Sequence, residues 1–268
     1  MAIRLYWSGG NRNEVNFGDS ISPVIVRHLS GKDVAYANIN ACDVAAIGSL
    51  LDKIIAREWK RLLRLRFDKI RIWGTGSFAP DTLLQGRDRL AIAAVRGNLT
   101  RDAMKLDDSV ALGDPGLLVG SLDIKAEKKY RWGIIPHVID RKVDVIQDMH
   151  KNAGRSCIID LADPDVLAVA GKIRACDFII SSSLHGLITA DAFGIPNVWM
   201  RVSENVYGGN WKFLDYFSTV GRTETEPLHL QNTAPDLRSL ENTASRVSGG
   251  LVEERQKSLV TAFAKMGL

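Results

Sequence analysis

The sequence predicts an α/β protein made of two Rossmann-like domains that face each other across a cleft. Short apolar runs rich in Val, Ile, Leu and Trp alternate with segments of helical spacing, a pattern typical of βαβ units around buried parallel strands. The runs form two series, separated by the glycine-rich turn at residues 113–116 and a charged stretch at residues 125–130. The length of 268 residues is sufficient for two domains of ordinary size.

The first series predicts an N-terminal domain over residues 1–122. Each of its apolar runs is followed by Gly, Ser or Asn, where a chain typically leaves a sheet. We expect strands at residues 3–7, 43–47, 70–73 and 90–95, and helices at residues 21–29 and from about Asn98.

The second series predicts a C-terminal domain over residues 123–235, followed by a helical tail over residues 236–268. Asp163 and Pro164 have the residue types of an N-cap and a first helical position. We expect strands at residues 131–135, 156–160, 178–181 and 197–200, and helices at residues 143–152, 165–175, 184–193, 211–217 and 244–266. Because ligands of open parallel sheets bind outside the carboxyl ends of the strands, the chemistry is expected in the cleft.

Composition excludes several classes of protein. The net charge of +4 is mildly basic and compatible with anionic substrates, but charges of both signs are interspersed, so nucleic-acid binding is not predicted. The three cysteines lie far apart and form no CxxC motif, so neither a disulfide framework nor a metal site is predicted. With no apolar leader at the N-terminus and no long apolar run, we expect a cytoplasmic protein.

One segment, residues 57–71, concentrates basic residues between apolar ones and resembles a basic amphipathic helix. It is either a surface helix with its apolar face in the core, or a contact for anionic lipid or a partner at the inner face of the membrane. The sequence leaves both open, together with the oligomeric state.

The first candidate site motif is Asn16-Phe17-Gly18-Asp19-Ser20, at a loop-to-helix junction. Gly18 would allow close approach of the backbone to a ligand, and Asp19 or Ser20 could cap the helix. Asp19 is also a candidate base for a substrate hydroxyl. The alternative is that the motif forms only a turn and a cap.

Two further motifs follow predicted strands of the first domain. Gly74 and Gly76 lie in a GxG turn that lacks the third glycine of a dinucleotide fingerprint, so NAD is not predicted and the turn is expected to line the cleft floor. Arg96 ends a strand, where its planar guanidinium could bind a carboxylate or phosphate in two-point contact. A surface salt bridge is the alternative for Arg96.

In the second domain, Ser181 to Leu187 form a serine-rich turn from strand to helix that places Ser183 and His185 at a helix N-terminus. Such a site suits phosphate, and a histidine there can act as acid or base, although a structural histidine remains an alternative. A Ser-His-Asp hydrolase is disfavoured because no GxSxG motif occurs. Lys212 after a glycine-rich loop could reach an anion, and His137 ends the first strand of this domain.

The combination of these motifs resembles the polysaccharide pyruvyl transferase family, especially its bacterial exopolysaccharide ketal pyruvyltransferase branch. The resemblance extends from about Asn16 to Phe217, and its most specific block is SSLHG followed by DAFGIP. It is carried by NFGD at residues 16–19, RG at 96–97, GDPGLL at 113–118, IPH at 135–137, SSSLHGLITADAFGIP at 181–196, and Lys212.

The resemblance implies a GT-B-like arrangement, phosphoenolpyruvate as donor, a saccharide or lipid-linked oligosaccharide as acceptor, and no cofactor or metal. Arg96 matches the family arginine associated with phosphoenolpyruvate, His185 the histidine of the HG motif, and Lys212 the downstream lysine. We therefore expect a ketal pyruvyl transferase in which protonated His185 is the acid and Asp19 accepts a proton. The donor is expected to be held by Arg96, Ser183, His185 and Lys212, with Arg96 and Lys212 also stabilising charge in the transition state. Asn16, Gly18, Gly74, Gly76 and His137 are expected to line the acceptor side of the cleft.

Two other functions remain open at this point. A GT-B glycosyltransferase with a nucleotide-sugar donor would share the two Rossmann-like halves and a basic cleft, and donor binding would separate it from a pyruvyl transferase. In a non-catalytic saccharide-binding protein, saccharide binding would persist after the loss of His185.

Overall fold

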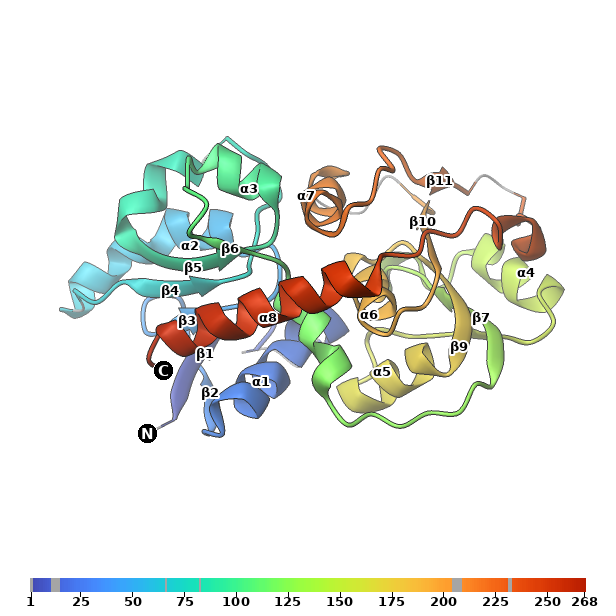
Figure 1. Cartoon of the computed structure of the whole chain (residues 1–268), viewed down its shortest axis with the longest axis horizontal. Helices are drawn as coiled ribbons and strands as arrows, with labels where there is room; N and C mark the ends of the chain where they lie inside the picture. The colour runs from blue at the N-terminus through green and yellow to red at the C-terminus, as the bar shows by residue number, and fades with distance from the viewer. Residues whose placement is uncertain (1, 11–14, 66, 82, 204–208, 231–232) are drawn as a thin grey trace.

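The structure, a computed structural model, consists of two α/β domains lying side by side with a long C-terminal helix running along both (Figure 1). It describes residues 2–10, 15–65, 67–81, 83–203, 209–230 and 233–268. The α/β class with two Rossmann-like parallel sheets, predicted from the sequence, is confirmed.

The N-terminal domain is built on a six-stranded parallel sheet of order β2-β1-β3-β4-β5-β6. Its helices α1 (Phe17–Ser30), α2 (Leu51–Arg57) and α3 (Asn98–Ala103) follow strands β1, β3 and β5 along the chain. The strands are β1 (Ile3–Tyr6), β2 (Val34–Tyr36), β3 (Val44–Ala45), β4 (Ile70–Trp73), β5 (Leu90–Val95) and β6 (Ala111–Leu112).

The C-terminal domain contains a five-stranded parallel sheet of order β11-β10-β9-β7-β8. Its strands are β7 (Tyr130–Ile135), β8 (Ser156–Ile158), β9 (Cys176–Ser181), β10 (Asn197–Arg201) and β11 (Leu228–His229). Its helices are α4 (Asp144–Asn152), α5 (Val166–Arg174), α6 (Leu184–Ala192) and α7 (Trp211–Val220).

Both domains share one strand order. The first strand of each sheet lies between the second and the third, so the chain switches direction between β1 and β3 in one domain and between β7 and β9 in the other. Ligands of such sheets bind outside the carboxyl ends of the strands at this switch. The loops after β1 and β9 are those that carry the NFGD and SSLHG motifs.

The two domains are joined by a continuous apolar core. Ile21 and Ile25 of α1 belong to the same buried cluster as Leu161 and Val169 of the second domain. The last helix, α8 (Gly249–Lys265), returns to pack on β4, β5 and β6 of the first domain, a position the sequence did not predict. There the indole nitrogen of Trp73 donates to the carbonyl of Leu259 at 2.9 Å.

Local details correct two predicted helix starts. Asn16, rather than Asp19 or Ser20, caps α1, because its side chain accepts a hydrogen bond from the main-chain nitrogen of Gly18 at 3.2 Å. The helix expected to start after Asp163 and Pro164 begins at Val166 and is capped by Asp165. Asp163 instead forms a turn by accepting from the nitrogen of Asp165, a local bond that competes with helix initiation.

The basic segment 57–71 is not one amphipathic helix. Helix α2 ends at Arg57, a 3-10 helix follows over Glu58–Arg64, and β4 begins at Ile70. Arg61 is buried and donates to the carbonyl oxygens of Ile39 and Cys42, because these groups at the end of the sheet need a partner away from water. In the part of the chain that the structure describes, no helix is both long and apolar enough to cross a membrane.

Candidate functional site

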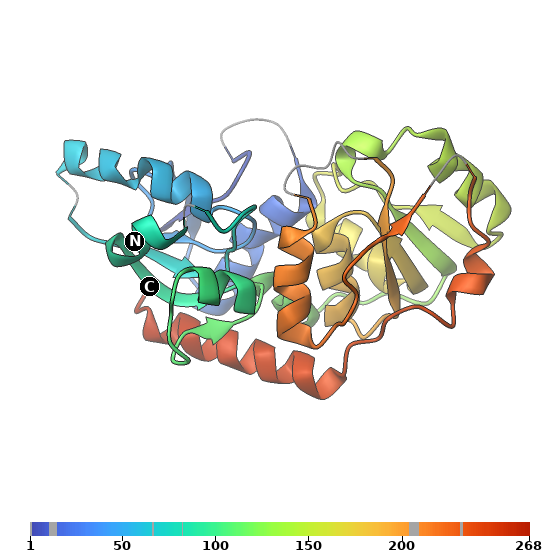
Figure 2. The same cartoon turned by 90° about the horizontal axis from the view of Figure 1, so that it is seen from above.

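Three helix N-termini meet where the two domains join. They carry Asp19 in the first turn of α1, His185 in the first turn of α6 and Lys212 in the first turn of α7. Figure 2 shows α7 at the boundary between the domains, where it packs against α3. Because the first backbone amides of a helix are unpaired and carry partial positive charge, this convergence favours an anionic ligand.

His185 is in direct contact with the NFGD motif of the other domain. A Cβ added at Gly18 would lie 2.1 Å from Nδ1 of the imidazole, so only glycine at this position leaves room for the ring. The NFGD motif therefore needs glycine at this position so that its backbone can approach the His185 side chain, which lies 167 positions later in the sequence. A close approach to a ligand is not the only reason for the glycine. The contact fixes the ring at the junction.

The opposite edge of the imidazole faces Asp114. Nε2 of His185 lies 3.8 Å from Oδ2 of Asp114, and neither atom has a hydrogen-bond partner among the described residues. The other oxygen of Asp114 accepts from the nitrogen of Gly116 at 2.8 Å, which holds the carboxyl group in place. Asp114 and His185 are thus held side by side, and the facing atoms of both keep their hydrogen-bonding capacity.

Burial shifts both members of this pair toward their uncharged forms. Burial, together with the nearby charges of Arg96 and Lys212, lowers the pKa of His185 to about 3. Burial raises the pKa of Asp114 to about 7, against the opposing effects of the Gly116 hydrogen bond and Arg96. These shifts favour a neutral imidazole in the unliganded protein, and the protonated His185 expected from the sequence stays a prediction for the donor-bound site.

The three serines before α6 differ in their hydrogen bonds. The hydroxyl of Ser181 accepts from the nitrogen of Ser183 at 3.0 Å and donates to its carbonyl at 2.9 Å, which shapes the turn. The hydroxyl of Ser182 accepts from the nitrogen of His137 at 2.8 Å and ties this turn to the end of β7. Ser183 is the N-cap residue of α6, yet its side chain forms no capping hydrogen bond, so its hydroxyl and the first amides are available to a ligand.

Asp19 and Lys212 form the charged part of the site. Burial raises the pKa of Asp19 to about 7, while the charges of Lys53 and Lys212 oppose the shift. Burial, aided by the charge of Arg96, lowers the pKa of Lys212 to about 8, while Asp19 opposes that shift. A carboxylate with a pKa near neutrality is suited to accept a proton at physiological pH.

Lys212 and His137 complete the polar groups near α6. The Lys212 side chain is 9% exposed, and its Nζ lies 5.9 Å from the ring centroid of Phe78 and 5.4 Å from that of Phe213. Burial and the charge of Lys212 lower the pKa of His137, whose Nδ1 accepts from the nitrogen of Ile139 at 3.4 Å. A buried cation at a helix N-terminus opposes the helix dipole, which an anionic ligand would relieve.

Arg96 is held in a network that bridges the domains. Its side chain has no exposed surface, and its Nε donates to Oδ2 of Asp215 in α7 at 2.9 Å. Its terminal nitrogens donate to the hydroxyl of Ser49 and the carbonyl of Ser77, each at 2.7 Å. Direct contact of Arg96 with a donor stays a prediction. In this structure the charge of Arg96 acts on the site by lowering the pKa values of His185 and Lys212.

The glycines expected on the cleft floor are buried among side chains. A Cβ at Gly76 would lie 2.4 Å from Cζ of Arg96, and one at Gly74 would lie 2.2 Å from Cδ of Pro115. Gly74 also has a positive φ of 80°. These glycines therefore make room for Arg96 and for the turn that carries Asp114.

Two residues of the site were not singled out from the sequence. Asp114 was noted only as a letter of the GDPGLL motif, although Asp before Pro at the start of a short helix is a recognisable capping signal. Asp215 lies in the middle of α7, where nothing in the local pattern distinguishes it from a surface acid. Only the fold reveals that it is fully buried against Arg96.

Comparison with known proteins identifies the family. Residues 3–204 match the model of a family described as polysaccharide pyruvyl transferase. The chain belongs to this family. The matched region of the pyruvyl transferase model contains Asp19, Arg96, Asp114 and His185, while Lys212 lies beyond it.

Individual relatives cover only parts of the chain. The uncharacterised protein L143 of Acanthamoeba polyphaga mimivirus is 33% identical over 135 residues, which is 47% of this chain and 47% of that protein. The succinoglycan biosynthesis protein ExoV of Rhizobium meliloti (strain 1021) is 29% identical over 136 residues, 49% of this chain and 41% of that protein. The matched region thus spans less than half the length of either relative.

Among solved structures, an uncharacterised protein of Klebsiella pneumoniae has a TM-score of 0.49 at 13% identity, covering 86% of this chain and 93% of that one. Within the described residues, no cluster of three or more His, Cys, Asp or Glu side chains could hold a metal ion. The candidate site brings together helix N-termini, the buried Lys212, His137 and His185, and two carboxyl groups of raised pKa, Asp19 and Asp114.

Proposed function

We propose that this protein transfers the pyruvyl group of phosphoenolpyruvate to a saccharide, forms a cyclic pyruvate ketal and releases phosphate. One observation carries the proposal: Gly18 of the NFGD motif and His185 of the SSLHG motif are in contact across the domain junction, beside Lys212. Family membership and the similarity to a succinoglycan biosynthesis protein support a role in bacterial exopolysaccharide synthesis.

The donor would bind at the N-terminus of α6. Phosphoenolpyruvate carries a phosphate and a carboxylate, which suit the free amides and Ser183 hydroxyl of α6 and the Lys212 ammonium. Such an anion would also offset the positive charges of Arg96 and Lys212, both of which lower the pKa of His185. Donor binding is therefore expected to move the proton of the Asp114–His185 pair onto the imidazole, so that the acid forms only when the donor is present.

The reaction then balances without a cofactor. The methylene carbon of the donor accepts a proton from His185 while the oxygen of a sugar hydroxyl bonds to C2. The bond between C2 and the phosphate oxygen breaks with both electrons going to phosphate, and a second hydroxyl of the same sugar bonds to C2. Of the two hydroxyl protons, Asp19 accepts the first, and the second leaves with the phosphate.

The test is calorimetric and thermal-shift titration with phosphoenolpyruvate, beside UDP- and GDP-sugars. Arg96→Ala is unsuitable as a control because it removes an interdomain bond to Asp215, so the donor-site variant is Lys212→Ala and its matched control is Lys142→Ala, an exposed lysine of the second domain. We expect saturable stabilisation by phosphoenolpyruvate, unchanged in Lys142→Ala and weakened at least about tenfold in Lys212→Ala. Stabilisation by a nucleotide sugar alone would instead indicate a glycosyltransferase.

A further inference from the structure

Two of the three cysteines meet in the second domain. The sulfur atoms of Cys157 and Cys176 lie 3.8 Å apart, although the residues are 19 positions apart in the sequence. Cys157 is the middle residue of β8, and Cys176 is the first residue of β9. Both side chains are thiols in this structure. No closely spaced cysteine motif predicts the pair, so only the fold reveals it.

A glycine in the strand between them leaves room for the two sulfurs. Gly133 of β7 pairs in register with Cys157, and β9 lies on the other side of β7. A Cβ added at Gly133 would lie 2.8 Å from Sγ of Cys176, so a larger residue would push this sulfur away. Because a disulfide bond is about 2.05 Å long, the sulfurs must approach by about 1.8 Å from their separation of 3.8 Å. A bridge is therefore within reach of both side chains.

The two thiols differ in their exposure to solvent. Cys157 is half-buried. Cys176 has no exposed surface and belongs to the same apolar cluster as Ile173 of α5. Its sulfur also lies 3.2 Å from the carbonyl oxygen of Lys172, to which the thiol donates. A small oxidant from solution therefore meets Cys157 first.

The two thiols also differ in acidity. The hydrogen bond from Cys176 lowers the pKa of the Cys157 thiol, against the effect of burial, and the charges of two lysines, Lys172 and Lys129, lower it further. The same hydrogen bond and burial raise the pKa of Cys176. Because the thiolate is the form that reacts with an oxidant, Cys157 is the more reactive of the two. An exposed thiol of lowered pKa beside a second cysteine is typical of reversible redox sites.

A metal site is a poor alternative for this pair. A structural zinc ion takes four ligands, and the two sulfurs provide only two. Within the described residues, no group of three or more His, Cys, Asp or Glu side chains could hold a metal ion. The arrangement is therefore better suited to redox chemistry between the sulfurs.

We propose that Cys157 and Cys176 form a reversible disulfide when the protein meets a peroxide, with Cys157 as the attacking thiol and Cys176 as the resolving one. This modification site goes beyond the proposed function and does not rest on it. Cys176 and Ser181 are the first and last residues of β9, so about 16 Å of strand separates the bridge from the turn that carries His185. The bridge therefore lies away from the candidate site.

The reaction balances with the peroxide as oxidant. The thiolate of Cys157 bonds to one peroxide oxygen, and the O–O bond breaks with its electron pair on the departing oxygen, which leaves as hydroxide. Cys157 is then a sulfenic acid. The sulfur of Cys176 bonds to the sulfur of Cys157, and the S–O bond breaks with its electron pair on oxygen, which leaves with the Cys176 proton as water. The two sulfurs lose two electrons in total, and the peroxide gains them.

The bridge keeps the oxidation of Cys157 reversible. A second peroxide converts a sulfenic acid to a sulfinic acid, which thiol reductants do not restore. With the sulfur of Cys176 at 3.8 Å, the disulfide forms before this second reaction, and a dithiol can reduce it again. Without Cys176, the sulfenic acid of Cys157 stays exposed to further peroxide.

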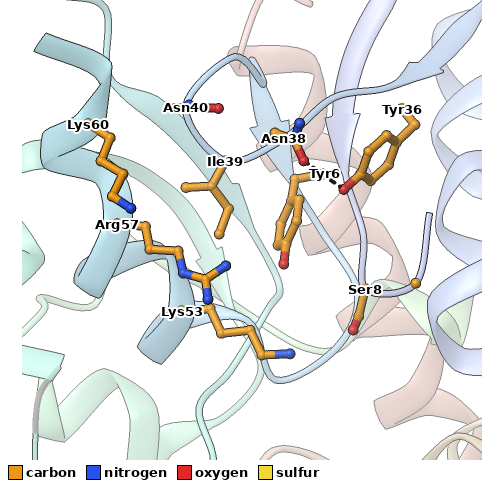
Figure 3. Close-up of a pocket in the computed structure, with 10 residues that line it drawn as sticks. Tyr6, Ser8, Tyr36, Asn38, Ile39, Asn40, Lys53, Arg57 and Lys60 are labelled. Atoms are coloured by element: carbon orange, nitrogen blue, oxygen red, sulfur yellow. Dashed lines mark hydrogen bonds between the residues drawn. The ribbon is translucent and has the colours of Figure 1, made fainter. Parts of the chain in front are cut away.

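The third cysteine provides a matched control. Cys42 has no exposed surface, like Cys176, but it belongs to the first domain. Its thiol donates to the carbonyl oxygen of Ile39 at 3.4 Å, and Ile39 lines the cavity of the first domain shown in Figure 3. Burial in the other domain keeps Cys42 away from the pair, so its loss should not affect the disulfide.

The test treats the full chain with hydrogen peroxide and follows intact mass, with peptide mapping of the products before and after dithiothreitol. The variants are Cys157→Ala, Cys176→Ala and Cys42→Ala, each checked for folding by circular dichroism before oxidation. Mapping of the wild type tests the pairing directly, so the proposal stays falsifiable if a variant fails to fold.

We expect the wild type and Cys42→Ala to lose the mass of two hydrogen atoms, to map to a Cys157–Cys176 bridge and to return to the starting mass with dithiothreitol. Cys157→Ala should stay unmodified. Cys176→Ala should gain oxygen on Cys157, with at least about tenfold less protein restored by the reductant. A wild type that gains oxygen, stays unchanged, or forms its bridge through Cys42 or a second chain would overturn the proposal.

Discussion

Two charged clusters cross the same domain junction and differ in how their polar atoms are satisfied. In the first, both carboxylate oxygens of Asp215 are used, by Arg96 and by the nitrogen and hydroxyl of Thr100 at 2.8 and 2.6 Å. In the second, Asp114 and His185 approach to 3.8 Å, and each has an atom without a partner among the described residues. Both are buried, so burial does not distinguish them.

The difference separates a structural role from a chemical one. A buried ion pair whose hydrogen bonds are all made resists change, because any new partner must replace an existing one. A buried pair with unsatisfied atoms and pKa values shifted toward the uncharged forms can accept a proton or a ligand. We infer that Arg96–Asp215 fixes the domain arrangement and that Asp114–His185 takes part in the reaction.

The largest effect is expected from breaking the satisfied cluster. Asp215→Ala leaves the guanidinium of Arg96 buried without its counter-charge, so the free energy of unfolding should fall by about 3–5 kcal/mol. Turnover should fall as well, because α7 also carries Lys212. Chemical denaturation monitored by circular dichroism measures the loss.

A matched control is Asp102→Ala, which removes an exposed acid whose ion pair with Arg101 is loose at 3.8 Å. It should change stability by less than about 1 kcal/mol. Equal stability of Asp215→Ala and the wild type would contradict a structural role for the cluster.

Breaking the Asp114–His185 pair should affect turnover more than stability. His185→Ala should reduce turnover by about 10²–10⁴-fold, the range of a lost acid–base group, with a stability change below about 2 kcal/mol. Phosphate release from phosphoenolpyruvate in the presence of acceptor measures turnover. If His185→Ala keeps most of its turnover, His185 is not the acid. If it fails to fold, the Asp114–His185 pair has a structural role like that of Arg96–Asp215.

A subtler change tests whether the position of the imidazole matters. Gly18→Ala adds a methyl group 2.1 Å from the present position of Nδ1, so the ring must move while the rest of the motif stays. Turnover should fall by about 10–100-fold, since displacements near 1 Å cost catalytic geometry that much. Ser20→Ala, two residues further along α1 and half-buried, is the control and should retain turnover.

The stability of Gly18→Ala should stay within about 2 kcal/mol of the wild type because a side-chain ring can rotate away. Loss of turnover together with loss of folding would show that the glycine serves packing alone.

Much of the fold could be predicted from periodicity, because long buried strands and amphipathic helices leave repeated signals. The eight strands predicted from apolar runs are all present, several with bounds shifted by one or two residues. Three short strands were missed: β2, β6 and β11 have two or three residues each and lie at or near sheet edges, so no periodic signal can build up. The final helix was predicted, but its docking site depends on the complementary face of β4 to β6.

The site was predictable residue by residue but not as an arrangement. Motif composition pointed to Asp19, Arg96, His185 and Lys212, and strand-to-helix turns placed three of them at helix N-termini. The pairing of Arg96 with Asp215 could not be predicted, because it joins residues 119 positions apart on different domains. The charge states of these side chains could not be predicted either, because their pKa values depend on burial in the folded chain.

The smallest effect tests the proton acceptor. Because burial raises the pKa of Asp19 to about 7, the base is protonated at acidic pH, and kcat/KM should rise with pH as it loses its proton near 7. Lys53 lowers that pKa, so Lys53→Ala should move this rise to higher pH by up to about one unit, whereas Lys257→Ala should leave it in place. In Asp19→Asn the rise should disappear. The Arg96–Asp215 cluster has no such free carboxyl group. A rise that persists in Asp19→Asn would contradict Asp19 as the base, and Asp114, whose pKa is also raised to about 7, would be the next residue to replace.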